Sequence, residues 1–259
     1  MLATILKIEL RKLLLNRSAV IIFLLFLLLG GLSMYLISGF VMEITEGEEI
    51  QINPMQQLTF PQIWSVFSFF ISYSAFLVPA IIIVITCGEL TSGIIRQHII
   101  EGLGRGDLIT GKILVILILV IAATTLYVIG SLSVGFYFTD SPTFENVTSG
   151  YPDIFRFALY LLGTCMLALT FAIYIGTTGL TLIAFLGYVI ILEPAVVYML
   201  TGTWAEYLPN TSFRELLSFP LLDQVRGYSA NYTAATLATF AWIIALGGLS
   251  YLRIRRKDL

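Results

Sequence analysis

Two long apolar runs follow one another in the stretch that decides the fold, residues 154–200, which read IFRFALYLLGTCMLALTFAIYIGTTGLTLIAFLGYVIILEPAVVYML. Each run reaches the roughly 20 residues that a helix needs to cross the hydrocarbon core of a bilayer. Only the sequence Gly-Thr-Thr-Gly at residues 176–179 separates them. Because a helix satisfies its own backbone hydrogen bonds in lipid, the stretch predicts two membrane-spanning helices joined in a tight hairpin.

Four further apolar runs lie on either side of this hairpin. The predicted spans are residues 19–42, 63–87, 113–138, 154–175, 179–200 and 233–252. Hydrophobic residues make up 58% of the 259 residues and charged residues only 12%, whereas about 25% of an ordinary soluble domain is charged. Alternating strands of the kind that build a membrane barrel do not occur. The sequence therefore predicts an all-α integral membrane protein, one transmembrane domain of six helices over residues 1–259.

The basic residues predict the side of the membrane on which each loop lies. Lysine and arginine stay mainly on the cytoplasmic side of membrane proteins, and an arrangement with a cytoplasmic N-terminus places 11 of the 14 there. The exceptions are Arg156, Arg214 and Arg226. We therefore expect a multi-pass membrane protein with both termini in the cytoplasm.

Composition and motifs exclude several classes of function. The net charge of -2 lacks the basic excess of a nucleic-acid-binding protein. Two cysteines, Cys87 and Cys165, and one histidine, His98, are too few for a disulfide scaffold or a multi-histidine metal site. Residues 106–112 match the first seven positions of a nucleotide-binding loop, but Ile113 stands where Ser or Thr is required. We expect no catalytic residues, no bound metal or cofactor, no nucleic-acid partner and no enzyme activity in this chain.

Residues 1–17 precede the first span and predict a helix that lies in the membrane interface. Leu2, Leu6, Leu10 and Leu13 recur at helical spacing, and Lys7 and Arg11 lie on the opposite side. Such a helix rests its apolar face on lipid and places its basic residues among anionic head groups. Glu9 and Lys12 do not fit this simple division. We expect Lys7, Arg11 and Lys12 to anchor the helix at the inner surface of the lipid bilayer.

Residues 88–112 form the longest predicted cytoplasmic loop. Ile95, Ile99 and Leu103 make an apolar row at helical spacing, and Gly102 and Gly104 can end the helix. Physics alone allows two interpretations of this short helix. It either docks a cytoplasmic partner or rests on the lipid interface.

Residues 201–232 are too polar to span the membrane alone. Pro209 and Pro220 bracket the segment, and Ser212 with Glu215 fits a capping box at the start of a helix. We expect one or two short helices that dip into the outer leaflet; the alternative is an ordinary outer loop.

A few polar residues stand inside the predicted spans. Glu193 either lines a substrate path or pairs near the surface, with Arg156 or Arg226 as its partner, and Pro194 predicts a kink. Ser65, Ser68 and Ser72 share one face of the second span. These small residues either allow close helix packing or form a mildly polar wall of a translocation path.

Two inner stretches resemble a known family. Glu89-x-x-x-Gly93-x-x-Arg96, followed by Gly102-x-Gly104-Arg105-x-Asp107-Leu-x-x-Gly111-Lys112, is similar to the loop after the second span in type-2 ABC-transporter permeases of exporters. The opening Lys7-Ile-Glu-Leu-Arg-Lys12 resembles that family's N-terminal connecting helix. Six spans and a long outer segment before the last span are also similar. The layout is alike over the whole chain, whereas the motifs are confined to these two stretches.

The resemblance implies a function and partners. It implies a permease that pairs with a second copy or a homologous permease and binds two cytoplasmic ABC ATPase subunits, which hold ATP and magnesium. The loop would act as the coupling helix on the ATPase surface, through the residues Glu89, Arg96, Gln97, Glu101 and Arg105. Ser68, Ser72 and Glu193 would lie near the substrate path. The expected location is the bacterial inner (cytoplasmic) membrane, and the alternative function is a membrane scaffold or assembly factor without a transport path.

Overall fold

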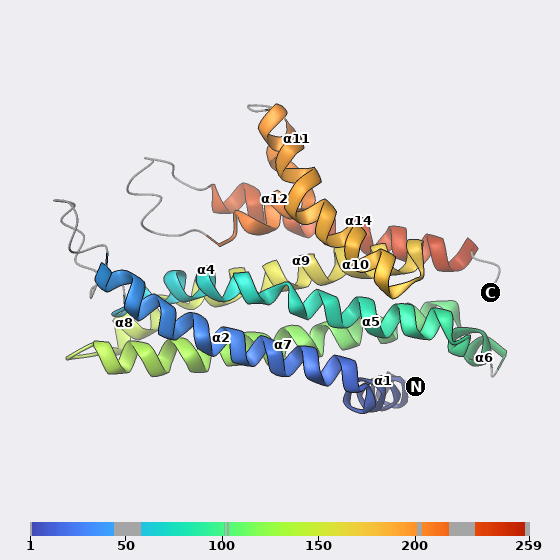
Figure 1. Cartoon of the computed structure of the whole chain (residues 1–259), viewed down its shortest axis with the longest axis horizontal. Helices are drawn as coiled ribbons and strands as arrows, with labels where there is room; N and C mark the ends of the chain where they lie inside the picture. Colours follow the sequence, from blue (N-terminus) through green and yellow to red (C-terminus); the bar gives the residue numbers. More distant parts are fainter. Residues whose placement is uncertain are drawn as a thin grey trace.

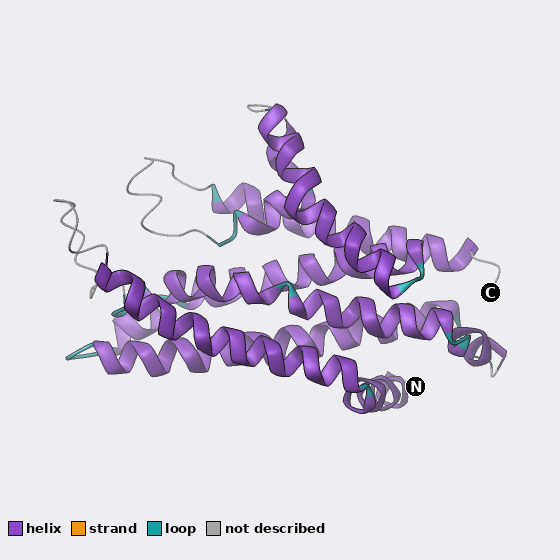
Figure 2. Ribbon diagram, viewed as in Figure 1, coloured by secondary structure: helices purple, strands orange, loops and turns teal. Residues whose placement is uncertain are grey.

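The computed structural model describes residues 2–43, 58–100, 102, 104–200, 204–217 and 231–256, and the regular structure in these ranges is entirely helical (Figure 2). Within these ranges, five helices are long and apolar enough to cross a membrane. The bent pair Leu6–Leu15 and Arg17–Ser33 brings the number to six when it is counted as one span. The expected all-α, multi-span architecture is therefore confirmed for these residues.

Long helices alternate with short connecting pieces along the chain (Figure 1). The long elements are α2 (Arg17–Glu43), the broken span of α4 (Ile63–Ala75) and α5 (Leu77–Thr91), α7 (Arg105–Phe138), α9 (Tyr151–Ile175), the composite of α10 (Thr178–Gly187), η2 (Tyr188–Leu192) and α11 (Glu193–Met199), and α14 (Tyr232–Arg256). The short elements are α1 (Leu2–Leu15), α6 (Ile94–Ile100), α8 (Phe144–Thr148), η3 (Trp204–Tyr207) and α12 (Pro209–Arg214).

Helix α9 forms the centre of the bundle. It packs against α4, α5, α7, α10, α12 and α14, while α2 covers α4 and α5 on the outside. The small residues Gly163, Ala168 and Ala172 allow neighbouring helices to approach α9 closely. Phe157 and Leu169 fill the space between helices and are fully buried. The most buried helix thus lies in the stretch that predicted the hairpin.

Both ends of the chain lie at the same end of the bundle, together with α1 and α6 (Figure 1). We call this the basic end, because Lys7, Arg11, Arg105 and the last turn of α14 lie there. The opposite end carries α8 (Figure 1). A chain that begins and ends on one side crosses the bundle an even number of times, as six spans require.

The connection between the second and third spans is shorter than the expected loop over residues 88–112. Helix α5 continues to Thr91 and α7 already begins at Arg105, so residues 92–104 connect them and include α6. Hydropathy placed the end of the second span and the start of the third too far apart, because the charged residues Glu89 and Lys112 are typical of loops. In the structure they lie 2.6 Å apart as an ion pair, which allows both helices to continue.

The expected tight hairpin between α9 and α10 is confirmed. Gly176 ends α9 with a left-handed φ of 84°, and α10 begins two residues later. The composite helix α10–η2–α11 then leans away from the bundle (Figure 1). Its disturbance at Pro194 takes the form of a π-helical turn, in which the Glu193 N–H donates to the Tyr188 carbonyl.

The segment after α11 contains short helices, as expected, but its predicted capping box is wrong. Helix α12 begins at Pro209, so Ser212 lies inside the helix and Glu215 lies just after its end. The Ser212 hydroxyl has no hydrogen-bond partner among the described residues. The local sequence predicted the wrong cap because the side chain of Glu193, which belongs to another helix, caps α12. Residues 218–230 lie outside the described part of the chain, and Pro220 and Arg226 belong to them.

Candidate functional site

Helix α6 is joined to α5 by only two residues, Ser92 and Gly93. Gly93 has a φ of 74°, the left-handed conformation that closes a helix. Helix α6 packs against α5. Ile95 is buried, whereas Ile100 is 85% exposed. The short helix therefore sits on the end of α5 and presents part of its surface at the basic end.

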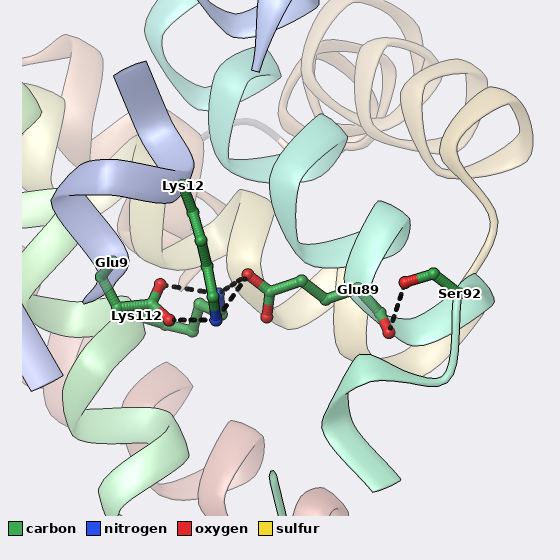
Figure 3. Close-up of polar contacts among 5 residues, drawn as sticks. All are labelled: Glu9, Lys12, Glu89, Ser92 and Lys112. Carbon is green, nitrogen blue, oxygen red and sulfur yellow. Dashed lines mark hydrogen bonds and ion pairs between the residues drawn. The ribbon is translucent and has the colours of Figure 1, made fainter. Parts of the chain in front are cut away.

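Four charged side chains meet beside this junction, and we call Glu9, Lys12, Glu89 and Lys112 the charge quartet (Figure 3). The Lys112 Nζ lies 2.9 Å from Glu9 Oε2 and 2.6 Å from Glu89 Oε1. The Lys12 Nζ lies 2.8 Å from Glu9 Oε1 and 3.5 Å from Glu89 Oε1. Each ammonium group thus contacts both carboxylates, and the quartet links α1, α5 and α7.

The charge quartet lies mostly inside the protein. Glu9, Glu89 and Lys112 are each no more than 7% exposed. Burial raises the pKa of Glu9, but the positive charge of Lys112 and the hydrogen bonds from Lys12 and Lys112 together lower it further, so its pKa lies below the usual value. Removing one partner of a buried ion pair costs about 3–5 kcal/mol, because the remaining charge is left uncompensated. Two carboxylates and two ammonium groups avoid that cost.

The expected membrane anchors divide into two groups. Lys7 and Arg11 are exposed on α1, as an anchoring role requires. Lys12 instead points toward Glu9 and Glu89 (Figure 3), so its ammonium group is paired within the protein, and its anchoring role stays a prediction. The sequence did carry a signal, because Glu9 and Lys12 were the charged residues that did not fit the amphipathic division.

The described residues among those assigned to ATPase coupling differ in their surroundings. Glu89 is buried in the charge quartet, so it does not present its carboxylate to a partner. Gln97 is exposed on α6, whereas the Arg96 side chain and Glu101 lie outside the described part. The Arg105 guanidinium donates to the backbone carbonyl of Arg255, which ties α7 to α14. A coupling role for the α6 residues stays a prediction.

Glu193 is a buried carboxylate, 1% exposed, at the start of α11. Its Oε1 accepts hydrogen bonds from the Thr211 N–H at 2.5 Å and the Thr211 hydroxyl at 2.9 Å. Its Oε2 accepts from the Asn210 N–H at 3.2 Å. These N–H groups belong to the first turn of α12, where no helical acceptor exists and negative charge is favoured.

The expected pairing of Glu193 with Arg156 is wrong. Arg156 pairs with Asp153 at 2.8 Å, and its guanidinium lies 3.8 Å from the centre of the Tyr232 ring. The carboxylate of Glu193 is instead used to hold α12. A role of Glu193 in a substrate path stays a prediction.

The π-helical turn before Glu193 gives Asn210 a second contact. In an α-helix the Val189 carbonyl would accept a hydrogen bond from the Glu193 N–H. Here the Glu193 N–H donates to the Tyr188 carbonyl instead. In a π-helix the Val189 carbonyl would accept from the residue five positions later, but that residue is Pro194, which has no N–H. The side-chain amide of Asn210 donates to this free carbonyl at 3.3 Å. Pro194 and Glu193 therefore build one docking place for α12.

The serine row on α4 uses its hydroxyl groups locally. Ser68 donates to the Ser65 carbonyl at 2.8 Å, and Ser72 donates to the Phe69 carbonyl at 2.5 Å. Ser68 is buried, while Ser65 and Ser72 are partly exposed. Hydroxyl groups bonded to their own helix can be packed in an apolar environment. The packing interpretation is sufficient for this geometry, and the translocation path stays a prediction.

Comparisons with protein-family models and with curated proteins gave no match. No group of three or more His, Cys, Asp or Glu side chains capable of holding a metal ion occurs among the described residues.

Proposed function

We propose that the chain is the permease subunit of an ATP-driven exporter of the type-2 ABC-transporter kind, which moves a hydrophobic or amphipathic substrate outward. The observation that carries the proposal is α6, a separate seven-residue helix seated on α5 at the end of the bundle where both termini lie. The exposed Ile100 on α6 offers an apolar contact to a partner. The chain has no complete nucleotide-binding loop, so the energy comes from separate ATPase subunits that bind ATP and magnesium.

In this proposal the basic end faces the cytoplasm, as the distribution of lysine and arginine favours. Closure of the ATPase pair moves α6, and α5 carries the movement into the membrane. The substrate passes between this chain and a second permease copy or homologue, along the spans α4–α5 and α10–α11. The exposed apolar side chains Ile183, Ile190 and Leu192 on the leaning helix support a hydrophobic route.

Co-purification and ATP hydrolysis test the proposal. The full-length chain, tagged and expressed in its native cells, is expected to retain an ATPase subunit in lipid nanodiscs and to show ATP hydrolysis. The double variant Arg96→Glu/Glu101→Arg on and beside α6 should lose both. The control Arg256→Glu changes an exposed charge on α14 at the same end and should retain both. If the double variant keeps its ATPase and full hydrolysis, α6 is not the coupling helix.

Cross-linking separates transport from the alternative function, a membrane scaffold. A cysteine at Ser72, which is partly exposed, is introduced after Cys87 and Cys165, both buried, have been replaced by alanine. A permease should change the cross-link yield between two copies when ATP and the ATPase are added. An unchanged yield favours the scaffold.

A further inference from the structure

The charge quartet connects two segments that lie far apart in the sequence. Helix α1 packs against α2 and α7. Through Glu89, the quartet adds a link from α1 to the end of α5, next to α6 (Figure 3). The attachment of α1 therefore depends on a residue that belongs to the α5–α6 junction.

The α5–α6 junction is short enough to transmit movement to Glu89. The Ser92 hydroxyl donates to the Glu89 carbonyl at 3.4 Å, and the Ser92 N–H donates to the Gly88 carbonyl at 3.0 Å. Gly93 then follows in its left-handed conformation, and α6 begins at the next residue. A displacement of α6 consequently acts on the last turn of α5, which carries Glu89.

Buried ion pairs respond to such a displacement more sharply than apolar contacts do. Their net contribution to stability is small compared with well-packed apolar residues, whereas the loss of one partner leaves an uncompensated buried charge. Withdrawal of Glu89 would leave two ammonium groups, Lys12 and Lys112, with the single carboxylate of Glu9. Because Glu9 and Lys12 both belong to α1, loosening of α1 admits water to the site, and water then solvates the uncompensated positive charge that includes Lys112.

We propose that the charge quartet is an electrostatic joint that makes the attachment of α1 depend on the position of α6, with Lys112 as the pivot. When Glu89 contacts both lysines, α1 is held against α7. When Glu89 is withdrawn, α1 loosens. The value of this joint for transport rests on the proposed function, but the linkage itself is a property of the chain alone.

Hydrogen–deuterium exchange of the full-length protein in lipid nanodiscs tests the joint without any ATPase. Glu89→Gln keeps the size of the side chain and removes its charge. Although Glu89 is not part of α1, this variant should speed exchange of the α1 amides on the order of tenfold, the effect of losing hydrogen bonds to charged groups. Coupling is reciprocal, so Glu9→Gln should speed exchange at residues 88–95.

Matched variants decide between the joint and a general loss of stability. Glu145→Gln removes an exposed carboxylate on α8 and should leave both segments unchanged. Reversal of all four quartet charges keeps opposite charges in contact. Exchange of the amides should be faster in Lys112→Glu alone and should return to the wild-type rate in the fourfold reversed variant. If the reversed quartet does not fold, the two single Glu→Gln variants still decide the question.

Two results would overturn the joint. The first is faster exchange in Glu89→Gln that stays within α5 and α6, and the second is uniform acceleration over all helices. Because no ATPase is present, either failure leaves the permease proposal untouched. Conversely, a chain that shows reciprocal exchange but retains no ATPase would have the joint without the proposed function.

Discussion

The backbone N–H groups of Asn210 and Thr211 point toward a carboxylate that precedes them by 17 and 18 residues. At the scale of the residue, Glu193 thus does the work that a capping side chain of α12 itself would do in an ordinary helix. A buried carboxylate needs such donors, because an uncompensated charge inside a protein is costly. The same requirement explains why Lys112 contacts two carboxylates.

Substitution of Glu193 should reveal its capping role. Glu193→Leu leaves the donors of Asn210 and Thr211 without an acceptor and should lower the free energy of unfolding by roughly 3 kcal/mol or more, whereas Glu193→Gln should cost about 1–2 kcal/mol. Denaturant unfolding of the purified protein in detergent measures both. Glu145→Gln, an exposed control, should change the free energy by less than about 0.5 kcal/mol. Equal stability of the Leu variant and wild type would show that the cap is unimportant.

Acidification should loosen α1 only at low pH. The pKa of Glu9 is lowered in the folded protein from its usual value of 4.5, so its stabilising charge is fully present above pH 4.5 and is lost as the pH falls through the lower pKa of the folded protein. Exchange of the α1 amides, corrected for its intrinsic pH dependence, should therefore stay constant between pH 6 and pH 8. A rise within that range would contradict the ion-paired state of Glu9.

At the scale of the element, α12 is a short helix that packs against α9, α11 and α14. Phe213 is fully buried and contacts α9 at Gly163, which lies about 18 Å along that helix from Tyr151 at 1.5 Å per residue. The Thr239 hydroxyl on α14 donates to the Ser212 carbonyl at 3.4 Å. Helix α12 is therefore wedged between α9, α11 and α14.

Gly163→Ala tests how tightly α12 is wedged. A methyl group at Gly163 would lie 2.8 Å from the Phe213 ring, so either α12 or α9 must shift. Overpacking of this kind should cost about 1–3 kcal/mol in denaturant unfolding. Gly187→Ala is the matched control, because nothing lies within 4 Å of its methyl position, and alanine in a helix should stabilise by roughly 0.5–1 kcal/mol. Opposite signs are expected, and a Gly163→Ala protein as stable as wild type would refute the close contact.

At the scale of the whole molecule, the helices form a bundle around α9 from which α10–η2–α11 leans away (Figure 1). The exposed apolar residues of the leaning helix suit contact with lipid or with another membrane helix. Neither surrounding contains the water that polar side chains would need in these positions. The end that holds both termini also holds the charge quartet and α6.

Thiol labelling should establish the orientation of this bundle. Single cysteines at Ser141, beyond the end of α7, and at Arg256, at the end of α14, are introduced into a chain whose buried Cys87 and Cys165 are replaced by alanine. In intact cells a membrane-impermeant maleimide should modify Ser141→Cys alone, and Arg256→Cys should react only after the membrane is opened. Labelling of both positions from outside would contradict an odd number of crossings between them.

The sequence by itself determined the helical class, the long spans and the hairpin at residues 176–179, because hydrophobic run length and glycine act locally. The polarity of Glu89 and Lys112 also misplaced the ends of α5 and α7, since hydropathy weighs each residue alone. Their ion pair exists only because two helices bring them together.

Only the tertiary structure decided the roles of Glu9, Lys12 and Glu193. From the sequence, Lys12 was an anchor, Glu9 an irregularity, and Ser212 the cap of a helix that Glu193 in fact caps. The physical reason is that a buried charge takes whichever partner lies nearest in space, at a cost of several kcal/mol if none does. Sequence spacing predicts the face of a helix, whereas packing of distant helices selects the partner.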